Sequence, residues 1–239
     1  MTRLAVVTGA AGGIGRAICR RLAADGCDIV AVDLSPTLAD TAGEVEAVGR
    51  RVLPVQADLT TKAGRGAVVR AVDEAGGAVH ALVNNAGITR DSRLVNMAAA
   101  DFAAVLEVNL GVPFLLTTAL APRFAPGSAV VNVGSRSYLG NFGQFNYAMA
   151  KGGIVGLTRA LALDLAPEVR VNAIAPGLTA TAMVETIPGD VLGRMVAAIP
   201  LRRMARPEEM AAVVSFLCSE DASYLTGHVV VAGGGRSLS

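Results

Sequence analysis

Short runs of consecutive apolar residues alternate along the whole sequence with longer stretches of helical spacing. The runs are solidly apolar, which is typical of parallel strands covered by helices on both faces. Strands are predicted at Leu4–Thr8, Asp28–Asp33, Arg51–Gln56, His80–Asn84, Ala129–Ser135, Val169–Ile174 and Val229–Ala232. Helices are predicted at Ile14–Ala24, Leu38–Val48, Thr61–Ala75, Ala98–Phe124, Asn146–Leu165 and Pro207–Ser219. This alternation, with right-handed crossovers, predicts an α/β fold: a Rossmann-type doubly wound parallel sheet of about seven strands in a three-layer sandwich.

No repeat, low-complexity tract or charged linker divides the chain, so residues 1–239 are expected to form a single domain. Hydrophobic residues make up 52% of the chain and charged residues 17%, which excludes a disordered protein and allows a sizeable core. The net charge of +1 gives no field that would attract nucleic acid or an anionic membrane. Neither is therefore expected as a partner.

The cysteines and histidines predict neither a disulfide framework nor a metal site. Cys19, Cys27 and Cys218 fall in no paired motif and are expected to be reduced core residues. His80 and His228 alone do not suggest a Cys/His metal site, although a cation held by carboxylates stays open. A strand follows the first residues directly, and no run of about eighteen apolar residues is evident. The sequence thus predicts no signal peptide, no spanning helix and a cytoplasmic location.

A glycine-rich turn joins the first predicted strand to the first predicted helix. Its sequence is Thr8-Gly9-Ala10-Ala11-Gly12-Gly13-Ile14-Gly15. Gly9 permits a tight turn, Gly13 lets the backbone approach a pyrophosphate, and Gly15 lets helix and strand pack closely. Gly12 and Ile14 complete the predicted contact, with the helix N-terminus facing the phosphates. A merely flexible loop is the alternative, but the position between first strand and first helix favours dinucleotide binding.

A carboxylate ends the second predicted strand. Asp33 lies eighteen residues after Gly15, where it can accept hydrogen bonds from the adenosine ribose hydroxyls, with Leu34 beside it. It would repel a 2′-phosphate, and neither Ala10–Gly13 nor Leu34–Leu38 contains a Lys or Arg to receive one. NAD(H) is therefore favoured over NADP(H). The alternative is an aspartate that only begins a turn.

Polar residues also follow the third and fourth predicted strands. Asp58, followed by Leu59, could bond the adenine amino group or could instead cap the next helix. The segment Asn84-Asn85-Ala86-Gly87 is either a turn of residues that tolerate positive φ, or a place where a cofactor lies against the backbone. Ligands of such sheets bind at the carboxyl ends of strands, so these residues are expected to share one site.

Tyr147 and Lys151 are four residues apart and therefore lie on one face of a predicted helix. A free phenol titrates near pH ~10, and a neighbouring ammonium lowers that pKa, so this tyrosine could exchange a proton with a substrate oxygen near neutral pH. Ser135 could bond the same oxygen. On spacing alone a surface contact is the commoner meaning of such a pair, and Ser135 could simply end a strand.

Residues 178–200 carry apolar side chains among polar ones, at Met183, Val184, Leu192, Met195 and Val196. We interpret this segment as a small mobile lid over an apolar pocket, which would suit an acyl chain or an alicyclic ring equally. Plain packing against the sheet edge is the alternative.

Taken together, these motifs resemble the short-chain dehydrogenase/reductase family over essentially the whole chain. The matching residues are Thr8, Gly9, Gly13, Gly15, Asn84 to Gly87, Asn109, Ser135, Tyr147, Lys151, Pro176 and Gly177, with Thr179 and Thr181 placed to reach a nicotinamide carboxamide. The motifs in this order are far more specific than any one of them. The resemblance implies an NAD(P)-binding Rossmann domain and an oxidoreductase acting on CH–OH groups. It also implies a homotetramer built on the long helices around Asn109 and Tyr147 and on the C-terminal strand.

The resemblance implies a role for each matched polar side chain. Tyr147 donates or accepts the alcohol proton, Lys151 lowers its pKa and bonds the nicotinamide ribose, and Ser135 orients the carbonyl oxygen. Asn109 holds a water that links Lys151 to solvent, although on sequence alone a structural residue that interrupts a helix is the simpler interpretation. The positive charge of oxidised nicotinamide would lower the tyrosine pKa further.

Within the family, four segments look like the 3-oxoacyl-[acyl-carrier-protein] reductases: residues 85–91, 143–147, 199–203 and 224–228. One departure lies on the substrate side. Eleven residues separate Ser135 from Tyr147, where the family usually has twelve, so this loop is expected to be shortened. Ser137 is a less favoured substitute for Ser135.

Two further departures concern the cofactor and the carrier. Those reductases normally use NADPH and carry a basic residue where this chain has Ala11-Gly12, and Asp33 contradicts that habit. The basic residues expected to dock an acidic carrier protein are missing from segments 126–128 and 166–169, with Arg123 and Arg170 nearby. The acyl group could therefore be carried by coenzyme A instead of acyl carrier protein.

Three functions stay open at this point. The first is NAD(H)-dependent, reversible hydride transfer to a 3-oxoacyl thioester. The second is an NAD-dependent dehydrogenase of a cyclic or steroid-like secondary alcohol. The third is a nucleotide-binding partner that has lost catalysis, against which the retention of Ser135, Tyr147 and Lys151 speaks.

Overall fold

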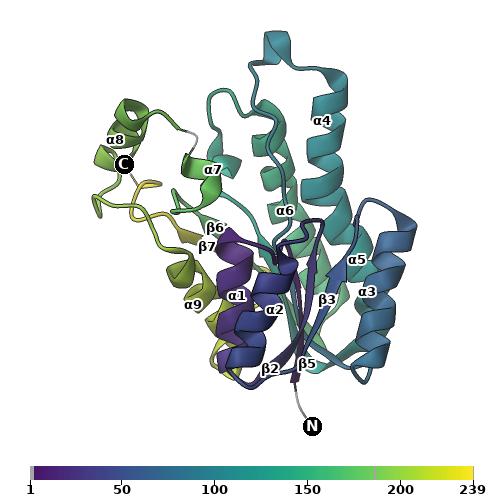
Figure 1. The fold of residues 1–239 in the computed structure, drawn as a ribbon. Coiled ribbons are helices and arrows are strands. Elements are labelled where there is room, and N and C mark those ends of the chain that lie inside the picture. Colours follow the sequence, from purple (N-terminus) through teal and green to yellow (C-terminus); the bar gives the residue numbers. More distant parts are fainter. Residues whose placement is uncertain (1–2, 186, 239) are drawn as a thin grey trace.

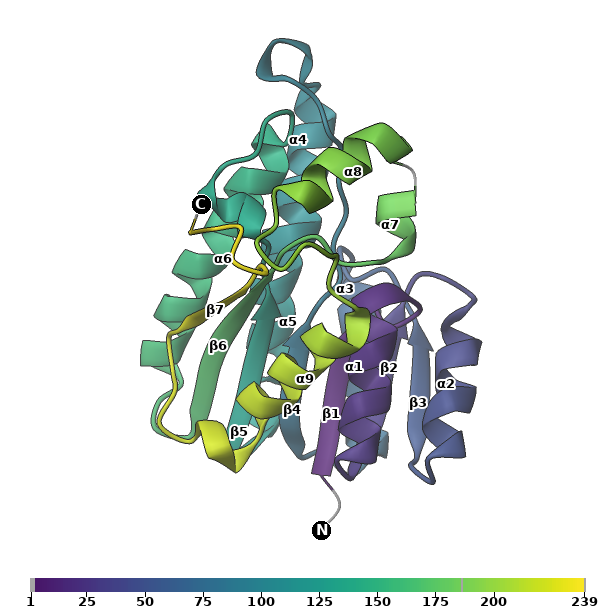
Figure 2. The same ribbon diagram turned by 90° about the vertical axis from the view of Figure 1, so that its left-hand side faces the viewer.

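The protein is built on a parallel sheet. A computed structural model describes residues 3–185 and 187–238, without the side chains of Met183 and Glu185. The sheet has seven strands in the order β3-β2-β1-β4-β5-β6-β7 (Figures 1 and 2). Their bounds are β1 Arg3–Thr8, β2 Cys27–Asp33, β3 Val52–Gln56, β4 Val79–Asn84, β5 Phe124–Val133, β6 Val169–Pro176 and β7 Val229–Ala232. The chain passes from β1 outward to β3 and then returns to β4, so the switch point lies between β1 and β4. The predicted fold class is confirmed.

Helices cover both faces of this sheet. They are α1 Gly13–Ala24, α2 Leu38–Ala47, α3 Lys62–Glu74, α4 Ala99–Leu106, α5 Val112–Leu120, α6 Phe145–Asp164, α7 Ala182–Glu185, α8 Gly189–Ala197 and α9 Pro207–Cys218. Helices α1, α2 and α9 lie on one face, and α3, α5 and α6 on the other (Figure 2). This is the three-layer arrangement that the strand–helix alternation predicts.

Successive side chains of each strand enter different layers. In β1, Ala5 and Val7 pack in the layer of α1 and α9, whereas Leu4 and Val6 pack in the layer of α3 and α5. Because both faces of the strand are buried, both sets of side chains must be apolar. This explains why the strands are continuous apolar runs in the sequence.

The largest difference from the predicted elements concerns the helix expected at Ala98–Phe124. The helical path is continuous but changes its winding, from α4 through the π-helical segment η2, Glu107–Gly111, to α5 and the 3-10 turn η3, Ala121–Arg123. Strand β5 then begins at Phe124, five residues before the predicted start at Ala129, and ends at Val133. Ser135 therefore lies just beyond the strand, where it precedes the 3-10 turn η4, Arg136–Leu139.

The helical stretch Ala99–Arg123 is long and apolar enough, by length and composition alone, to pass a test for a membrane span. Its most apolar window has a mean hydropathy of 1.6, and 39% of that window is buried within the protein. In the fold, α4 packs against α6, and α5 packs against α3 and β4. Part of the apolar content of this stretch therefore serves packing within the domain.

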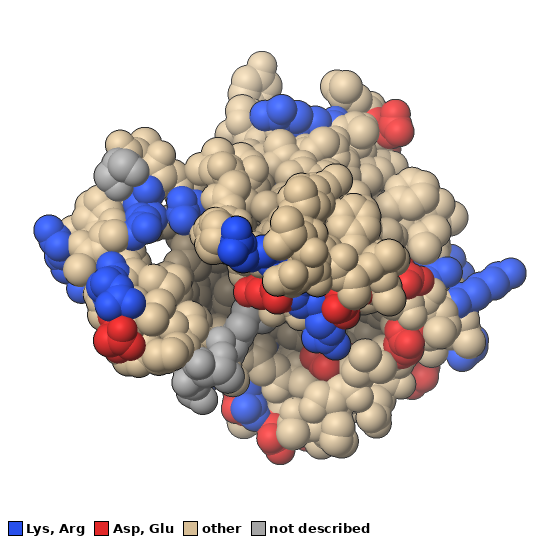
Figure 3. Space-filling model, turned by 90° about the horizontal axis from the view of Figure 1, so that it is seen from above, with Lys and Arg blue, Asp and Glu red and all other residues tan. Residues whose placement is uncertain are grey.

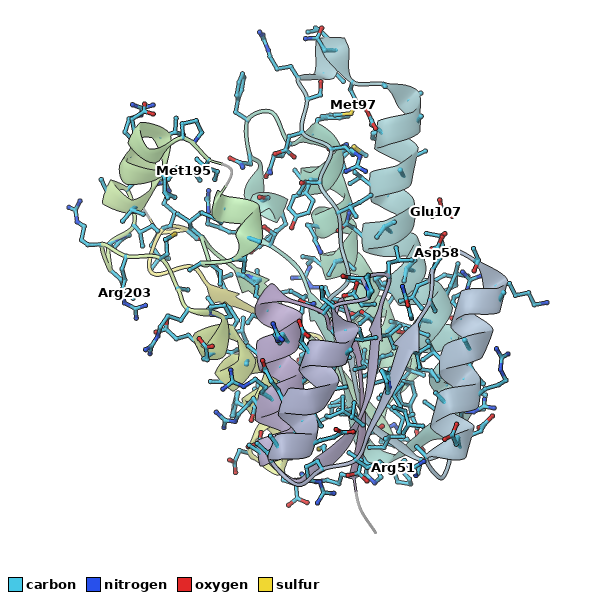
Figure 4. The ribbon with its side chains drawn as sticks, in the orientation of Figure 1. Arg51, Asp58, Met97, Glu107, Met195 and Arg203 are labelled. Atoms are coloured by element: carbon cyan, nitrogen blue, oxygen red, sulfur yellow. The ribbon has the colours of Figure 1, made fainter. Side chains whose placement is uncertain are left out.

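After β6 the chain leaves the sheet as an arm that carries α7 and α8, at the upper left of Figure 1. Met195, at the end of α8, lies high on this arm in Figure 4. The C-terminal residues run beneath it, where Leu201 N donates to the carbonyl oxygen of Gly234. Seen down the carboxyl ends of the strands in Figure 3, the molecule is hollowed between this arm and the main body.

Candidate active site

The glycine-rich turn joins β1 to α1 at the switch point of the sheet, as predicted. Gly9 and Gly13 have φ values of 64° and 52°, a region that favours glycine. A Cβ on Gly15 would lie 1.9 Å from the carbonyl oxygen of Gly9, so α1 and β1 pack as closely as the sequence suggested. A Cβ on Gly12 would meet no atom within 4 Å, so the backbone before α1 faces open space.

This turn is fixed to the segment that follows β4. The hydroxyl of Thr8 accepts hydrogen bonds from the backbone nitrogens of Asn85 and Ala86, both at 3.0 Å. The Asn85 side chain donates to the carbonyl oxygens of Thr8 and Gly9, also at 3.0 Å. Asn85 therefore holds the ends of β1 and β4 together. The interpretation of residues 84–87 as a simple turn did not include this structural role.

Asp33 ends β2 and binds the same turn. Its Oδ2 accepts from the backbone nitrogen of Ala11 and its Oδ1 from that of Ser35, each at 2.9 Å. The carboxylate thus lies beside the glycine-rich turn, and it also begins the turn after β2, as the alternative interpretation expected. Leu34 is 63% exposed at this edge of the sheet.

Asp58 follows β3 and lies at the upper edge of the sheet in Figure 4. Its Oδ1 accepts from Thr60, both from the backbone nitrogen at 2.9 Å and from the hydroxyl at 2.7 Å, which lowers the pKa of the carboxyl group. The helix cap is Thr61, whose hydroxyl accepts from Gly64 N. The alternative that Asp58 caps the next helix is therefore wrong, because the cap lies three residues later. The Asp58 carboxylate is exposed at this edge of the sheet, and Leu59 is buried.

Asn109 lies in the π-helical segment η2 and is completely buried. Its Nδ2 donates to the carbonyl oxygens of Ile88 and Val105, at 2.8 and 2.9 Å. Its Oδ1 is buried and has no hydrogen-bond partner among the described residues. A Cβ on Gly87 would lie 2.5 Å from that oxygen and 3.6 Å from Lys151 Nζ, so only glycine leaves this space open. The wider winding of η2 lets Asn109 both interrupt the helix and direct an unpaired oxygen toward Lys151.

Lys151 is 4% exposed, and its Nζ donates to the carbonyl oxygen of Val133, the last residue of β5, at 2.8 Å. Burial disfavours its charged form and lowers the pKa to about 8. A lysine in this state can change its protonation near neutral pH, so it is suited to exchanging protons.

Tyr147 lies one turn before Lys151 on the same face of α6, with Lys151 Nζ 5.6 Å from the centre of its ring. Burial raises the pKa of the phenol, a hydrogen bond with Ser135 lowers it, and the charge of Asp91 raises it. The net direction is upward, so the expectation that Lys151 lowers this pKa is wrong for the protein on its own. Desolvation outweighs the cation, and a lower pKa requires a charge that the protein does not supply, such as oxidised nicotinamide.

The structure distinguishes the two candidate serines. Ser135 forms a hydrogen bond with Tyr147, and its Oγ also accepts from Ser137 N at 3.1 Å. Ser137 directs its own hydroxyl to Gln144 Oε1, at 3.0 Å. Ser135 is therefore the serine beside the phenol, although the loop before Tyr147 is one residue short.

Pro176 ends β6, and Gly177 N donates to the carbonyl oxygen of Ala232 at 2.9 Å. The two threonines that follow differ. Thr179 is 5% exposed, and its hydroxyl donates to the carbonyl oxygen of Gly177, so it packs inside the arm. Thr181 lies across from the glycine-rich turn, where its Cγ2 would be 3.2 Å from a Cβ on Gly13. Of the pair, Thr181 is the one that faces the expected cofactor path.

Two cavities flank these residues. The larger, of about 660 Å³, lies between residues 92–95 and the loop 138–143, and is also lined by Phe145 and Met149. A helix turns by about 200° over two residues, so Phe145 and Met149 lie on the side of α6 opposite to Tyr147. The described residues of the predicted lid, 178–200, do not line this cavity. The smaller, of about 200 Å³, lies at the root of the arm between Leu178, Ile199 and Met210.

The sequence also contains a buried polar network that spacing did not reveal. Asn84 Nδ2 donates to Asn132 Oδ1 at 2.9 Å, and Asn132 Nδ2 donates to the hydroxyl of Thr158 at 3.0 Å. It links β4, β5 and α6 directly behind the site. A polar residue at the same position of neighbouring strands was the available signal, because Asn84 and Asn132 are register partners.

Among the side chains that the structure describes, which leave out Glu185, no group of three or more His, Cys, Asp or Glu is placed to hold a metal ion. The residues present fit a dinucleotide instead. The open space beside Gly12, the uncovered backbone at the start of α1 and the unpaired Asn109 oxygen all lie at the carboxyl ends of the strands.

Comparison with known proteins agrees with this arrangement. Residues 9–237 match the family described as enoyl-(acyl carrier protein) reductase. The chain is 39% identical to the 3-oxoacyl-[acyl-carrier-protein] reductase of Thermotoga maritima, over 98% of this chain and 97% of that protein. It is also 39% identical to the acetoacetyl-CoA reductase of Allochromatium vinosum, over 98% of each.

Solved structures show the same fold. A short-chain alcohol dehydrogenase from Sinorhizobium meliloti superposes with a TM-score of 0.94 at 36% identity, over 99% of this chain and 97% of that one. A blue fluorescent protein from a metagenomic library, in complex with NADPH, superposes with a TM-score of 0.92 at 34% identity, over 98% of this chain and 97% of that one. With its fold, its motifs and these relatives taken together, the chain belongs to the short-chain dehydrogenase/reductase family of oxidoreductases, which act on CH–OH groups.

Proposed function

We propose that this protein is an NAD(H)-dependent reductase of 3-oxoacyl thioesters, which in reverse oxidises 3-hydroxyacyl thioesters. The observation that carries the proposal is the convergence of Tyr147, Ser135, Lys151 and Asn109 near Gly87, in the segment whose Asn85 and Ala86 are hydrogen-bonded to the glycine-rich turn. The named activities of the Thermotoga and Allochromatium relatives support the thioester as substrate.

In the proposed mechanism, bound nicotinamide supplies or accepts the hydride. Ser135 orients the carbonyl oxygen of the substrate, and Tyr147 gives that oxygen a proton as the carbonyl is reduced. Lys151 restores the proton to Tyr147 and binds the nicotinamide ribose. The unpaired Oδ1 of Asn109 holds a water that connects Lys151 to solvent, which explains why a buried amide oxygen lacks a protein partner.

Asp33 is the basis for proposing NAD(H) over NADP(H). Its carboxylate lies beside the glycine-rich turn, where a 2′-phosphate would be repelled. The nearby Arg16 of α1 is paired with Glu44 at 3.0 Å and with Asp40 at 3.6 Å, so its charge is already neutralised. The remaining cofactor contacts are proposed for Gly9, Gly12, Gly13, Ile14, Gly15, Leu34, Asp58, Leu59, Asn85, Ala86, Gly87, Pro176, Gly177 and Thr181.

Coenzyme A is proposed as the acyl carrier in preference to acyl carrier protein. The two arginines near the expected docking segments are occupied within the domain. Arg123 binds both carboxylate oxygens of Asp73, at 2.6 and 2.9 Å. Arg170 donates to the carbonyl oxygens of Leu217, Ser219 and Ala222. Neither guanidinium is presented to an acidic partner.

We propose that residues 178–200 act as the substrate lid and that the chain forms a homotetramer. Apolar side chains are exposed on two separate faces: Phe114, Leu115 and Leu163 on α5 and α6, and Phe216, Tyr224 and Val231 near α9 and β7. Two such faces suit two perpendicular dimer axes.

The free cysteines Cys19, Cys27 and Cys218 suit the reducing cytoplasm, which is the proposed location of the protein.

The test is a panel of acetoacetyl-coenzyme A, the matching acyl-carrier-protein thioester and cyclic ketones, each with NADH and NADPH. The proposal expects NADH oxidation with the coenzyme A thioester, and loss of turnover with retained NADH binding in Tyr147→Phe. Preferred reduction of cyclic ketones would favour a dehydrogenase of cyclic alcohols instead. NADH binding without reduction of any substrate would indicate a nucleotide-binding partner.

A further inference from the structure

The carboxylate of Asp91, in the segment after β4, is held at the start of α6. Gln144, the residue before this helix, donates from Nε2 to Asp91 Oδ2 at 2.9 Å. The Oε1 of Gln144 accepts in turn from the hydroxyl of Ser137 at 3.0 Å and from Asn141 Nδ2 at 2.8 Å. With both ends of its amide engaged, Gln144 has a fixed orientation and so does the carboxylate that it binds.

Two further contacts join this segment to the first turn of α6. Asn146, fully buried, donates from Nδ2 to the carbonyl oxygen of Arg90 at 3.0 Å and accepts from Tyr147 N at 2.7 Å. Ser92 pairs with Gln144 in an isolated parallel bridge. Residues 90 to 92 are therefore bound to the turn that carries Tyr147, which places the carboxylate of Asp91 beside that turn.

The first turn of α6 contains no acidic residue of its own. The positive end of the helix dipole at this point favours the phenolate form of Tyr147. Burial opposes the phenolate most strongly and raises the pKa, Ser135 lowers it, and Asp91 raises it. Lys151 Nζ lies 5.6 Å from the centre of the Tyr147 ring, and Arg90, the residue before Asp91, pairs with Asp101 at 3.9 Å. Asp91 therefore contributes a negative charge near the start of α6, and this charge opposes the stabilising effect of the helix dipole on the phenolate of Tyr147.

We propose that Asp91 is a positioning residue whose negative charge, held beside the first turn of α6, adds to burial in keeping the Tyr147 phenol protonated. The site is thereby prepared to give a proton to a carbonyl oxygen, not to take one from an alcohol. In reduction the O–H bond of the phenol breaks, and its proton goes to the oxygen that receives electron density as the hydride adds to carbon. This inference rests on the proposed function of Tyr147.

The test uses Asp91→Asn, because an asparagine oxygen still accepts from Gln144 while the charge is lost. Asp101→Asn is the matched control, since it removes an exposed carboxylate from α4 that pairs with Arg90. The chain has three tyrosines and no tryptophan. In a background of Tyr138→Phe and Tyr224→Phe, tyrosinate absorbance therefore reports Tyr147 alone, without any substrate.

The expected result is a Tyr147 titration at lower pH in Asp91→Asn than in the parent, with the control coinciding with the parent. The difference should shrink at high ionic strength, because Asp91 is exposed. With NAD and a 3-hydroxyacyl thioester at neutral pH, oxidation should rise roughly two- to tenfold, the range expected for loss of one partly screened charge. A structural role for Asp91 would lower activity without moving the titration.

Coincident titration curves for the parent and Asp91→Asn would overturn the inference. The result remains separate from the proposed function. If Tyr147→Phe is inactive and Asp91→Asn leaves the titration unchanged, the role of Asp91 alone is wrong. If Tyr147→Phe retains turnover, the proposed function of Tyr147 is wrong, whatever Asp91→Asn does to the absorbance.

Discussion

The ammonium of Lys151 donates to the carbonyl oxygen of Val133 at 2.8 Å and thereby ties α6 to the end of β5. This bond places one charged group in an almost fully buried position between the phenol of Tyr147 and the amide of Asn109. The same burial that suits Lys151 to proton exchange makes its charge costly to the folded state.

A pH-dependent stability follows from this burial. The pKa of Lys151 is about 8 in the folded protein, against 10.5 for a lysine in the unfolded chain, so between these values the unfolded chain binds the extra proton. Stability from this group therefore rises with pH across that window, by about 3 kcal/mol in all. Between pH 7 and pH 10, the unfolding free energy measured with urea should rise more for wild type than for Lys151→Met. For Lys62→Met, which alters an exposed lysine, the change should equal that of wild type. Parallel behaviour of all three proteins would contradict the assignment.

The glycine-rich turn gives a second prediction. In Gly15→Ala the new methyl group would overlap the carbonyl oxygen of Gly9, so α1 must move away from β1. We expect a loss of roughly 2 kcal/mol or more in unfolding free energy, together with weakened NADH binding. Gly12→Ala is the matched control in the same turn, because its methyl group meets open space, and it should cost less than about 1 kcal/mol. Chemical unfolding compares the two variants, and equal losses of unfolding free energy would contradict the steric argument. NADH fluorescence titration measures the weakened binding of Gly15→Ala.

The sequence predicted the fold class and the place of each motif because strand burial and glycine positions leave local signals. Asn109 shows where such signals end. Its position in the order of motifs was evident, but the sequence does not reveal the π-helical winding of η2 or the hydrogen bond from Asn109 to the carbonyl oxygen of Ile88, 21 residues away. The prediction of a lowered pKa for Tyr147 was wrong for a similar reason. Spacing reveals the neighbouring Lys151, but it does not reveal the burial that raises the pKa of the phenol.

The network behind the site gives a third prediction, on stability without direct contact to ligands. Thr158 accepts from Asn132 Nδ2 and donates to the carbonyl oxygen of Ile154, all within the core. Thr158→Val keeps the shape but leaves the Asn132 amide unpaired, at a cost of about 1–3 kcal/mol. Thr118→Val removes the same kind of bond within a helix, to Phe114, on an exposed surface, and should cost less than about 0.5 kcal/mol. Thermal and urea unfolding of the two variants measure these costs. An unchanged unfolding free energy in Thr158→Val would show that the network does not contribute to stability.

The fourth prediction concerns the cofactor preference. Asp33 accepts hydrogen bonds from Ala11 and Ser35, and in the proposed function its charge repels a 2′-phosphate. In Asp33→Ala the turn loses these two bonds, so NADH binding should weaken, while NADPH binding gains from the removal of the negative charge. The ratio of the two affinities should fall on the order of tenfold, measured by fluorescence titration with each reduced nucleotide. Glu46→Ala, which removes an exposed carboxylate from α2, controls for the general change in charge and should leave the ratio unchanged. An unchanged ratio in Asp33→Ala would remove the physical basis for preferring NAD(H), even if both affinities fell together.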